Sequence, residues 1–278
     1  MRGRVTPPGL CSSQESRIEA PPVSPASTAS LSEWLPLEEP ATARVRLLCC
    51  PHSGSGISPF VPWRRQLPEG VALCPVRYPG RESTMHRSLL RSVGDLVDGV
   101  AAALAARPAR PTVILGHSLG ASVAYELARA LQTQAAAPGA LASPPVLIAS
   151  GRQAPEHPHE TRLCELPDEA LVDAISRRYG GIPAAVRAEP ELLAMMLPIL
   201  RADLTAAETW RPRPGPRWAG PTWIVNGDRD ELDDVKLEDW RRSVTGPIDI
   251  QRLPGDHFYL FDAKSGFLPA LLTKLASL

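Results

Sequence analysis

Short apolar runs alternate with segments of helical periodicity along most of the chain. The apolar runs predict strands at 44–50, 71–78, 111–116, 144–150, 221–227 and 248–253. Apolar residues spaced three and four apart predict helices at 92–106, 119–134, 235–244 and 265–278. Apolar strands separated by helices are typical of a parallel sheet that is covered on both faces. The pattern therefore predicts an α/β fold with a mostly parallel central sheet.

One stretch, residues 167–209, departs from this alternation. It shows several helical segments in succession with no strand between them, and it lies between two predicted strands. We expect a helical lid insertion at about 165–210, placed over the strand ends, where open α/β sheets bind their ligands. The lid and the sheet would form one α/β domain over 31–278. Residues 1–30 are rich in Pro, Ser and Thr and are predicted to be a disordered extension.

Charge and cysteine content exclude several classes of function. The 30 basic residues balance the 30 acidic ones, so no charge excess indicates nucleic acid or an anionic membrane as a partner. No apolar run approaches the roughly 18 residues that a membrane span needs. The five cysteines form no C-x-x-C pair, and three lie within apolar, strand-like runs. This usage favours reduced thiols and a cytoplasmic protein over a disulfide framework.

The segment Gly116-His117-Ser118-Leu119-Gly120 matches the pattern G-x-S-x-G. A predicted strand precedes it and a predicted helix follows it, which is the context in which such a serine is a nucleophile. The start of the following helix favours negative charge close to the serine, where an oxyanion develops. The simpler alternative is a tight turn with a solvated serine. We expect Ser118 to be the nucleophile.

A serine nucleophile needs a base, and in this strand–turn–helix context the acid and then the histidine follow it in the chain. His257 lies in the glycine turn "PGDHF", directly after the last predicted strand, so it reaches the same sheet edge as Ser118. The other histidines are less well placed: His52 lies in the loop after the first strand, His117 lies within the serine turn, and His86, His157 and His159 lie in polar stretches expected at the surface. His257 is the predicted base.

The acid is expected in the loop that follows the strand at 221–227. That loop is crowded with acidic residues, and its simpler interpretation is a solvated acidic turn. Asp230 and Asp228 are the candidates. Asp228 is close to the strand end and suited to structuring the turn, whereas Asp230 is better placed to reach a distant imidazole, so Asp230 is preferred. Its role would be to fix the tautomer of His257 and to stabilise the imidazolium.

Two backbone N–H groups are needed to hold an oxyanion. One is expected from Leu119, the residue after the nucleophile, and the other from the loop "CCPHSGSG" after the first strand. Ser53 is the first choice in that loop and Gly54 the second. A phosphate-binding loop is disfavoured, because the lysine and the Ser or Thr of that motif are absent. The simplest alternative is a flexible loop.

Several segments in order, "LLCCPHSGSGISPFVPW", "GHSLGASVAYELA", "PILRAD" and "GDHFYL", resemble the type II thioesterases of polyketide and nonribosomal peptide synthesis, over about 32–278. The resemblance implies an α/β-hydrolase fold that removes acyl or aminoacyl groups from the 4'-phosphopantetheine thiol of acyl or peptidyl carrier proteins through an acyl-serine. It places nucleophile, acid and base on Ser118, Asp230 and His257, and implies no metal or diffusible cofactor. Ser53 stands where the family commonly has Ala, a change that leaves the backbone amide intact.

Apolar residues of the helical insertion are candidates for the wall of an acyl channel, although such a stripe is more often plain core: Leu192, Met195, Met196 and Leu200. A general acyl-CoA thioesterase or a small-molecule ester hydrolase would use the same three catalytic residues. A non-catalytic binding protein of this fold, and an acyltransferase or cyclase, are further alternatives. The intact set Ser118, Asp230 and His257 favours catalysis.

Overall fold

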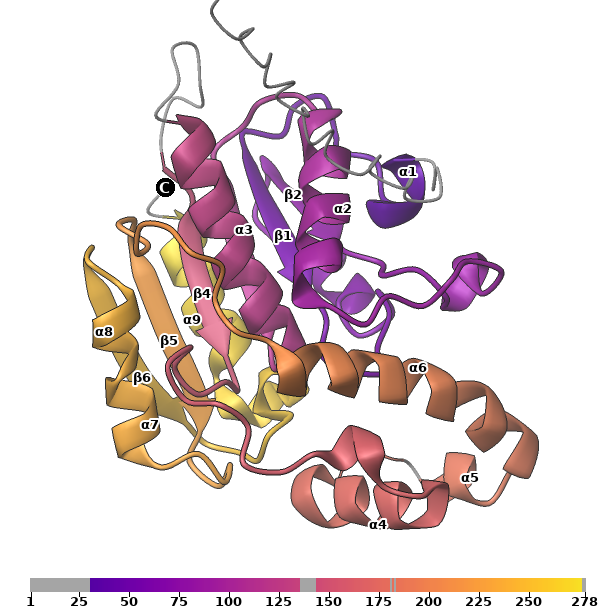
Figure 1. Cartoon of the computed structure of the whole chain (residues 1–278). Coiled ribbons are helices and arrows are strands. Elements are labelled where there is room, and N and C mark those ends of the chain that lie inside the picture. Colours follow the sequence, from indigo (N-terminus) through magenta and orange to yellow (C-terminus); the bar gives the residue numbers. More distant parts are fainter. Residues whose placement is uncertain (1–30, 136–143, 181, 183, 277–278) are drawn as a thin grey trace, which may run out of the picture.

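A single parallel sheet organises the computed structural model, which describes residues 31–135, 144–180, 182 and 184–276. Its strands lie in the order β2-β1-β3-β4-β5-β6, and each pairs with its neighbour in parallel (Figure 1). The strands are β1 Val45–Cys50, β2 Val71–Pro75, β3 Thr112–His117, β4 Val146–Ser150, β5 Thr222–Gly227 and β6 Ile248–Leu253. The predicted parallel sheet is confirmed, although the strand expected over 71–78 ends at Pro75.

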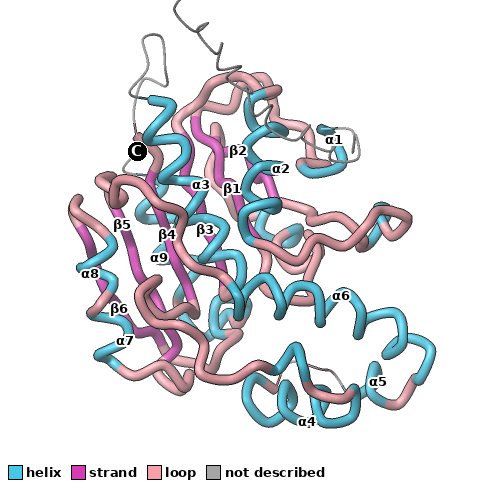
Figure 2. Tube along the Cα trace, viewed as in Figure 1, coloured by secondary structure: helices cyan, strands magenta, loops and turns pink. Residues whose placement is uncertain are grey.

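α-Helices lie in most of the connections between these strands, with α1 before β1 and α9 after β6 (Figure 2). Their bounds are α1 Leu31–Trp34, α2 Val93–Ala105, α3 Leu119–Ala135, α4 Asp168–Tyr179, α5 Ala184–Arg187, α6 Pro190–Thr209, α7 Asp234–Glu238, α8 Trp240–Ser243 and α9 Phe267–Ala276. The helix predicted over 235–244 is in fact two short helices that are separated at Asp239. The predicted extension at 1–30 lies outside the described residues.

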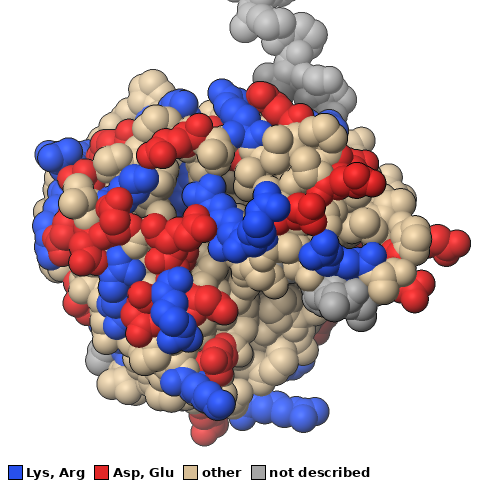
Figure 3. Space-filling view, turned by 90° about the horizontal axis from the view of Figure 1, so that it is seen from below, with Lys and Arg blue, Asp and Glu red and all other residues tan. Residues whose placement is uncertain are grey.

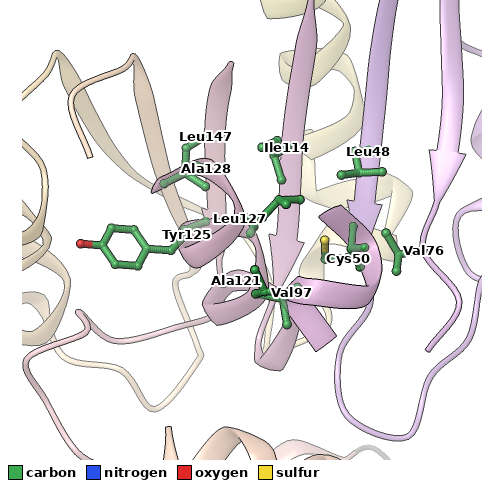
Figure 4. Close-up of a cluster of buried hydrophobic side chains, with 14 of the residues drawn as sticks. Leu48, Cys50, Val76, Val97, Ile114, Ala121, Tyr125, Leu127, Ala128 and Leu147 are labelled. Atoms are coloured by element: carbon green, nitrogen blue, oxygen red, sulfur yellow. The ribbon is translucent and has the colours of Figure 1, made fainter. Parts of the chain in front are cut away.

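Alternate strand residues point to opposite faces of the sheet, and a separate apolar cluster covers each face. Ile114 of β3 joins a core with α2 and α3, in which Leu48, Val97 and Leu127 also lie (Figure 4). On the other face, the neighbouring residue Leu115 packs in a cluster that includes side chains of α9. Apolar side chains on both faces explain why the strands other than β6 appear in the sequence as mostly continuous apolar runs.

The helices α4, α5 and α6 follow β4 and precede β5, and they lie beyond the carboxyl ends of the strands (Figure 1). They form an apolar cluster of their own, with Leu171 and Ile175 of α4 packed with Leu197 and Leu204 of α6. A helical insertion therefore stands where the sequence pattern predicts one. Its movement as a lid stays a prediction.

Charged side chains of both signs are interspersed over the end of the molecule seen in Figure 3. Within the described ranges, no helix combines the length and apolar character that crossing a membrane requires. Four cysteines, Cys49, Cys50, Cys74 and Cys164, are free and buried. Burial raises the pKa of the Cys50 and Cys74 thiols to about 12, so these thiols stay protonated and unreactive near neutral pH.

Candidate active site

Ser118 occupies the turn between β3 and α3 in a strained backbone conformation. Its φ is +55°, in the left-handed region that non-glycine residues seldom adopt, and its N–H donates to the Ser150 carbonyl at 2.8 Å. Both flanking glycines are required by close backbone contacts. A Cβ on Gly116 would lie 2.0 Å from the Gly120 carbonyl oxygen, and a Cβ on Gly120 would lie 2.0 Å from that of Cys50. The glycines therefore permit the turn that exposes Ser118.

His257 and Asp230 meet across the loops that follow β6 and β5. His257 Nδ1 lies 2.8 Å from Asp230 Oδ2, and the side chains are only 8% and 3% exposed. The other carboxylate oxygen of Asp230 accepts the N–H of Glu231 at 2.8 Å. A carboxylate in this position holds the proton on Nδ1, so Nε2 is the nitrogen available for proton transfer. The ring of Tyr179 lies against that of His257, with centroids 4.6 Å apart.

Asp228, the other candidate for the acid, has a different environment. Its Oδ1 accepts the N–H of Gly255 at 2.9 Å and lies 3.4 Å from Arg229, and its side chain is 47% exposed. The contact with Gly255 ties the β5 loop to the β6 loop. The structure thus brings Asp230, rather than Asp228, to the imidazole of His257.

Ser118 and His257 line the same cavity, whose volume is about 760 Å³ with its open mouth included. Met196 and Leu200 of α6 line it as well, as the sequence predicts. Leu192 and Met195, the other two candidates for the acyl channel, are not among the residues that line it, and they are 50% and 51% exposed. Residues four apart share a helix face, so Met196 and Leu200 face the cavity together, whereas Met195 is rotated away from them and Leu192 lies one turn nearer the start of α6.

The loop of residues 52–56, which follows β1, forms another part of the cavity wall through His52, Ser53 and Gly54. The N–H of Gly54 donates to Asp203 Oδ2 of α6 at 2.8 Å, so that amide is already engaged. This contact disfavours Gly54 as an oxyanion donor and leaves Ser53 the better candidate. Leu119, the other candidate, is the first residue of α3, where backbone N–H groups have no helical partner.

Comparison with known proteins identifies the family. The profile of the Thioesterase domain matches residues 45–277. The chain belongs to the thioesterase family. It is a thioester hydrolase, and the family membership inferred from sequence resemblance is confirmed.

This thioesterase is similar to several proteins that are themselves named as thioesterases. It is 34% identical over 263 residues to a probable cadicidin biosynthesis thioesterase of Streptomyces griseus, covering 93% of this chain and 70% of that protein. It is 36% identical to the thioesterase PikA5 of Streptomyces venezuelae, covering 82% of this chain and 80% of that one. Among solved structures, the type II thioesterase BorB from the borrelidin biosynthetic cluster superposes with a TM-score of 0.75 at 31% identity, covering 88% of this chain and 97% of that one.

Two further histidines of the thioesterase lie close to His257 but are held neutral. Burial, together with the nearby charge of His257, lowers the pKa of His52 to about 3 and that of His117 well below its ordinary value. His117 is fully buried, and its Nδ1 lies 3.0 Å from Ser150 Oγ. Groups that resist protonation are poor proton acceptors. His257 is therefore the best placed base in the cavity.

A polar cluster on the cavity wall was missed from the sequence. Arg152, His159 and Glu208 all line the cavity, and the Arg152 guanidinium contacts His159 Nε2 and donates to the Ala207 carbonyl at 3.0 Å. Burial and the charge of Arg152 lower the pKa of His159 to about 3. His159, expected at the solvated surface, is half-buried and lines the cavity. The sequence did offer one signal, which is that Arg152 lies two residues after β4, at the carboxyl end of a strand that meets the cavity.

Proposed function

We propose that this thioesterase is a type II enzyme that removes acyl or aminoacyl groups from the 4'-phosphopantetheine arm of acyl or peptidyl carrier proteins in polyketide or nonribosomal peptide synthesis. The observation that carries the proposal is the contact of His257 Nδ1 with Asp230 Oδ2 beside the cavity that Ser118 also lines. Nucleophile, base and acid are Ser118, His257 and Asp230. Relatives named for biosynthetic pathways, among them the type II thioesterase BorB, support the choice of substrate.

The first half-reaction transfers the acyl group to the enzyme. Ser118 Oγ attacks the thioester carbonyl carbon while His257 Nε2 takes the hydroxyl proton. The N–H groups of Leu119 and Ser53 hold the resulting oxyanion. When the intermediate collapses, the C–S bond breaks, and the imidazolium returns its proton to the leaving thiolate of the pantetheine arm. Asp230 stabilises the imidazolium in between.

The second half-reaction frees the enzyme by hydrolysis. His257 removes a proton from water, the water oxygen attacks the acyl-serine carbonyl, and the same two amides hold the second oxyanion. Collapse returns the proton to Ser118 Oγ and releases a carboxylic acid. Every proton transfer uses a side chain of this protein, so in this proposal neither a metal nor a diffusible cofactor takes part.

The apolar wall of the cavity suits the acyl group. Met196, Leu200 and Leu204 of α6 and Ile175 of α4 present aliphatic side chains to the cavity that contains Ser118. We assign this wall to the acyl channel, with the pantetheine arm entering past α4–α6 from a docked carrier protein. The proposed setting is the cytoplasm, where buried thiols such as those of Cys49 and Cys50 remain reduced.

The test compares Ser118→Ala with Ser122→Ala on an acetyl-pantetheinyl carrier protein. Ser122 lies four residues away in α3, is fully buried, and its hydroxyl has no hydrogen-bond partner among the described residues, so its removal should leave the rate within about threefold. Ser118→Ala should lower kcat by at least about 10³-fold. Undiminished release of acetate by Ser118→Ala would refute the assignment.

The choice of substrate is tested separately with wild-type enzyme. We expect kcat/KM for the acetyl carrier protein to exceed that for acetyl-CoA by at least about tenfold, because the carrier adds a docking surface that CoA lacks. Equal values, or a preference for acetyl-CoA or for a simple ester, would favour the general acyl-CoA thioesterase or small-molecule hydrolase instead.

A further inference from the structure

A carboxylate of α6 binds the backbone of loop 52–56. Asp203 has no exposed surface, and its Oδ2 accepts the N–H of Gly54 at 2.8 Å across 149 positions of the sequence. Gly54 has a φ of +79°, in the left-handed region, so its amide reaches this carboxylate in a conformation that other residues rarely adopt. The loop that carries the Ser53 amide is thus anchored at the very next residue.

Arg81 completes the anchor from a third segment of the chain. Its Nη1 and Nη2 lie 2.6 Å and 2.8 Å from the two oxygens of Asp203, a bidentate pair that is buried. The same Nη1 donates to the carbonyl of Ser55 at 2.9 Å, and the guanidinium lies over the ring of Tyr78. Together, the Arg81–Asp203 pair binds an N–H and a carbonyl of loop 52–56 that lie on successive residues.

The residue after Arg81 holds the next part of the loop. Glu82 Oε1 accepts the N–H of Ile57 at 3.1 Å and the hydroxyl of Ser58 at 3.0 Å. Glu82 adopts a φ of +51°, which is a strained conformation for a non-glycine residue. The strained backbone lets the two adjacent side chains, Arg81 and Glu82, bind different parts of one loop.

We propose that the Arg81–Asp203 pair positions loop 52–56 so that the Ser53 N–H points at the developing oxyanion, and that helix α6 thereby controls the oxyanion hole. The inference rests on the proposed role of the Ser53 amide. The physical basis is that Asp203 accepts the hydrogen bond of the Gly54 N–H and Arg81 donates to the Ser55 carbonyl. Of the amides in this part of the loop, that of Ser53 is then the one free to donate into the cavity. Asp203 and Arg81 are positioning residues, since they act through the backbone.

As a consequence, helix α6 both contacts the substrate and positions a group that takes part in catalysis. α6 supplies Met196 and Leu200 to the cavity wall and, one turn after Leu200, Asp203 to loop 52–56. A side chain of Leu200 also lies against Gly54, because a Cβ there would be 3.4 Å from its Cδ1. The helix that would contact the acyl group is therefore the helix that holds the amide donor in place.

The test uses two variants of the full chain and one matched control. Asp203→Asn weakens the pair but leaves Arg81 buried without its counter-charge, so it is accompanied by the double variant Arg81→Met with Asp203→Leu. The double variant removes both charges, a replacement that buried ion pairs often tolerate, and still deprives the Gly54 N–H of its acceptor. The control is Glu39→Gln, which weakens the buried Arg46–Glu39 pair near the amino ends of β1 and β3.

The substrate is a small acyl-pantetheine thioester, so the measurement does not depend on a carrier protein. We expect both test variants to lower kcat on the order of 10²-fold with KM within about threefold, since a displaced oxyanion donor acts in the transition state. A trifluoromethyl ketone analogue, which forms a tetrahedral oxyanion with the serine, should lose affinity by the same factor. A nonhydrolysable thioether analogue should keep its affinity. Glu39→Gln should keep kcat within about threefold.

Three results would overturn the inference. They are a folded double variant with wild-type kcat, a kcat loss in Glu39→Gln as large as that in the test variants, and an increase in KM with kcat unchanged. The last would make the pair part of substrate binding. Because the wild-type enzyme serves as the reference on the small thioester, a failure to act on carrier proteins would contradict the proposed function and leave this inference standing.

Discussion

Replacing Asp230 by Asn is the sharpest test of the charge arrangement in the site. The carboxylate is nearly fully buried, and its Oδ2 lies 2.8 Å from His257 Nδ1. An amide in the same place can present its NH₂ group to Nδ1, which then becomes the acceptor and leaves the proton on Nε2. With Nε2 protonated, His257 cannot take the proton of Ser118. The same change of tautomer in a serine protease lowers kcat by about 10⁴-fold, and we expect a loss of similar size here.

Asp228→Asn is the matched control, because it makes the same chemical change two residues away. The Oδ1 of Asp228 accepts the N–H of Gly255, and an Asn oxygen can keep that hydrogen bond. The ion pair with Arg229 is exposed, and such pairs contribute at most about 1 kcal/mol to stability. We therefore expect Asp228→Asn to keep kcat within about threefold.

Both variants would be assayed with saturating acyl-pantetheine, by following thiol release with a chromogenic reagent. The pH dependence is informative too, since Asp230→Asn should regain part of its rate at alkaline pH, where hydroxide replaces the missing base. Circular dichroism establishes that both variants are folded. A larger loss in Asp228→Asn than in Asp230→Asn would refute the reasoning and make Asp228 the acid.

Two other expectations concern pH and chain length. Burial lowers the pKa of His117 far below the value of about 6.5 expected in an unfolded chain, so below that pH the unfolded state binds more protons. The free energy of unfolding should therefore fall as pH drops, by up to about 1.4 kcal/mol per unit for this residue. Urea unfolding between about pH 7.5 and 5.5 measures it, and constant or rising stability on acidification would contradict it. Met196→Trp should reduce kcat/KM for octanoyl-pantetheine at least about tenfold more than for acetyl-pantetheine. Leu192→Trp, at an exposed position of the same helix, should change neither, and equal chain-length effects in the two variants would argue against the acyl channel.

Most of the sheet was predictable because β1 to β5 are buried on both faces, which makes each a largely apolar run, whereas the edge strand β6 alternates apolar and polar residues. The pairing of Asp230 with His257 was also predictable in outline, since each residue follows a strand that ends at the same sheet edge. The exposure of Leu192 and Met195 was not predictable. Apolar residues at helical spacing indicate a helix, but they do not show which part of that helix borders the cavity. The contact of His159 with Arg152 was not predictable either, because the sequence around His159 is polar and does not indicate it.

The role proposed for Asp203 could not be predicted from the local sequence pattern. Its segment, "PILRAD", supports the family resemblance, yet nothing near it in the sequence indicates a role for a carboxylate on an apolar helix. That role comes from tertiary contacts with Gly54 and Arg81, from two other segments of the chain. A buried charge is costly unless it is paired and hydrogen-bonded, and each Asp203 oxygen has a partner. The structure alone supplies the partners.

The glycines beside Ser118 extend the same argument to the other half of the oxyanion hole. Gly120 lets α3 approach the end of β1, since a Cβ there would meet the carbonyl oxygens of Cys50 and Pro51 at 2.0 Å and 2.7 Å. Pro51 is only two residues before Ser53, so the close approach that exposes the serine also brings the start of α3 beside loop 52–56. Asp203 then fixes that loop one residue beyond Ser53. The two amides proposed to hold the oxyanion are thus positioned by different residues. Gly120, which has no side chain, lets the Leu119 amide approach loop 52–56, and the buried carboxylate of Asp203 anchors the loop that carries the Ser53 amide.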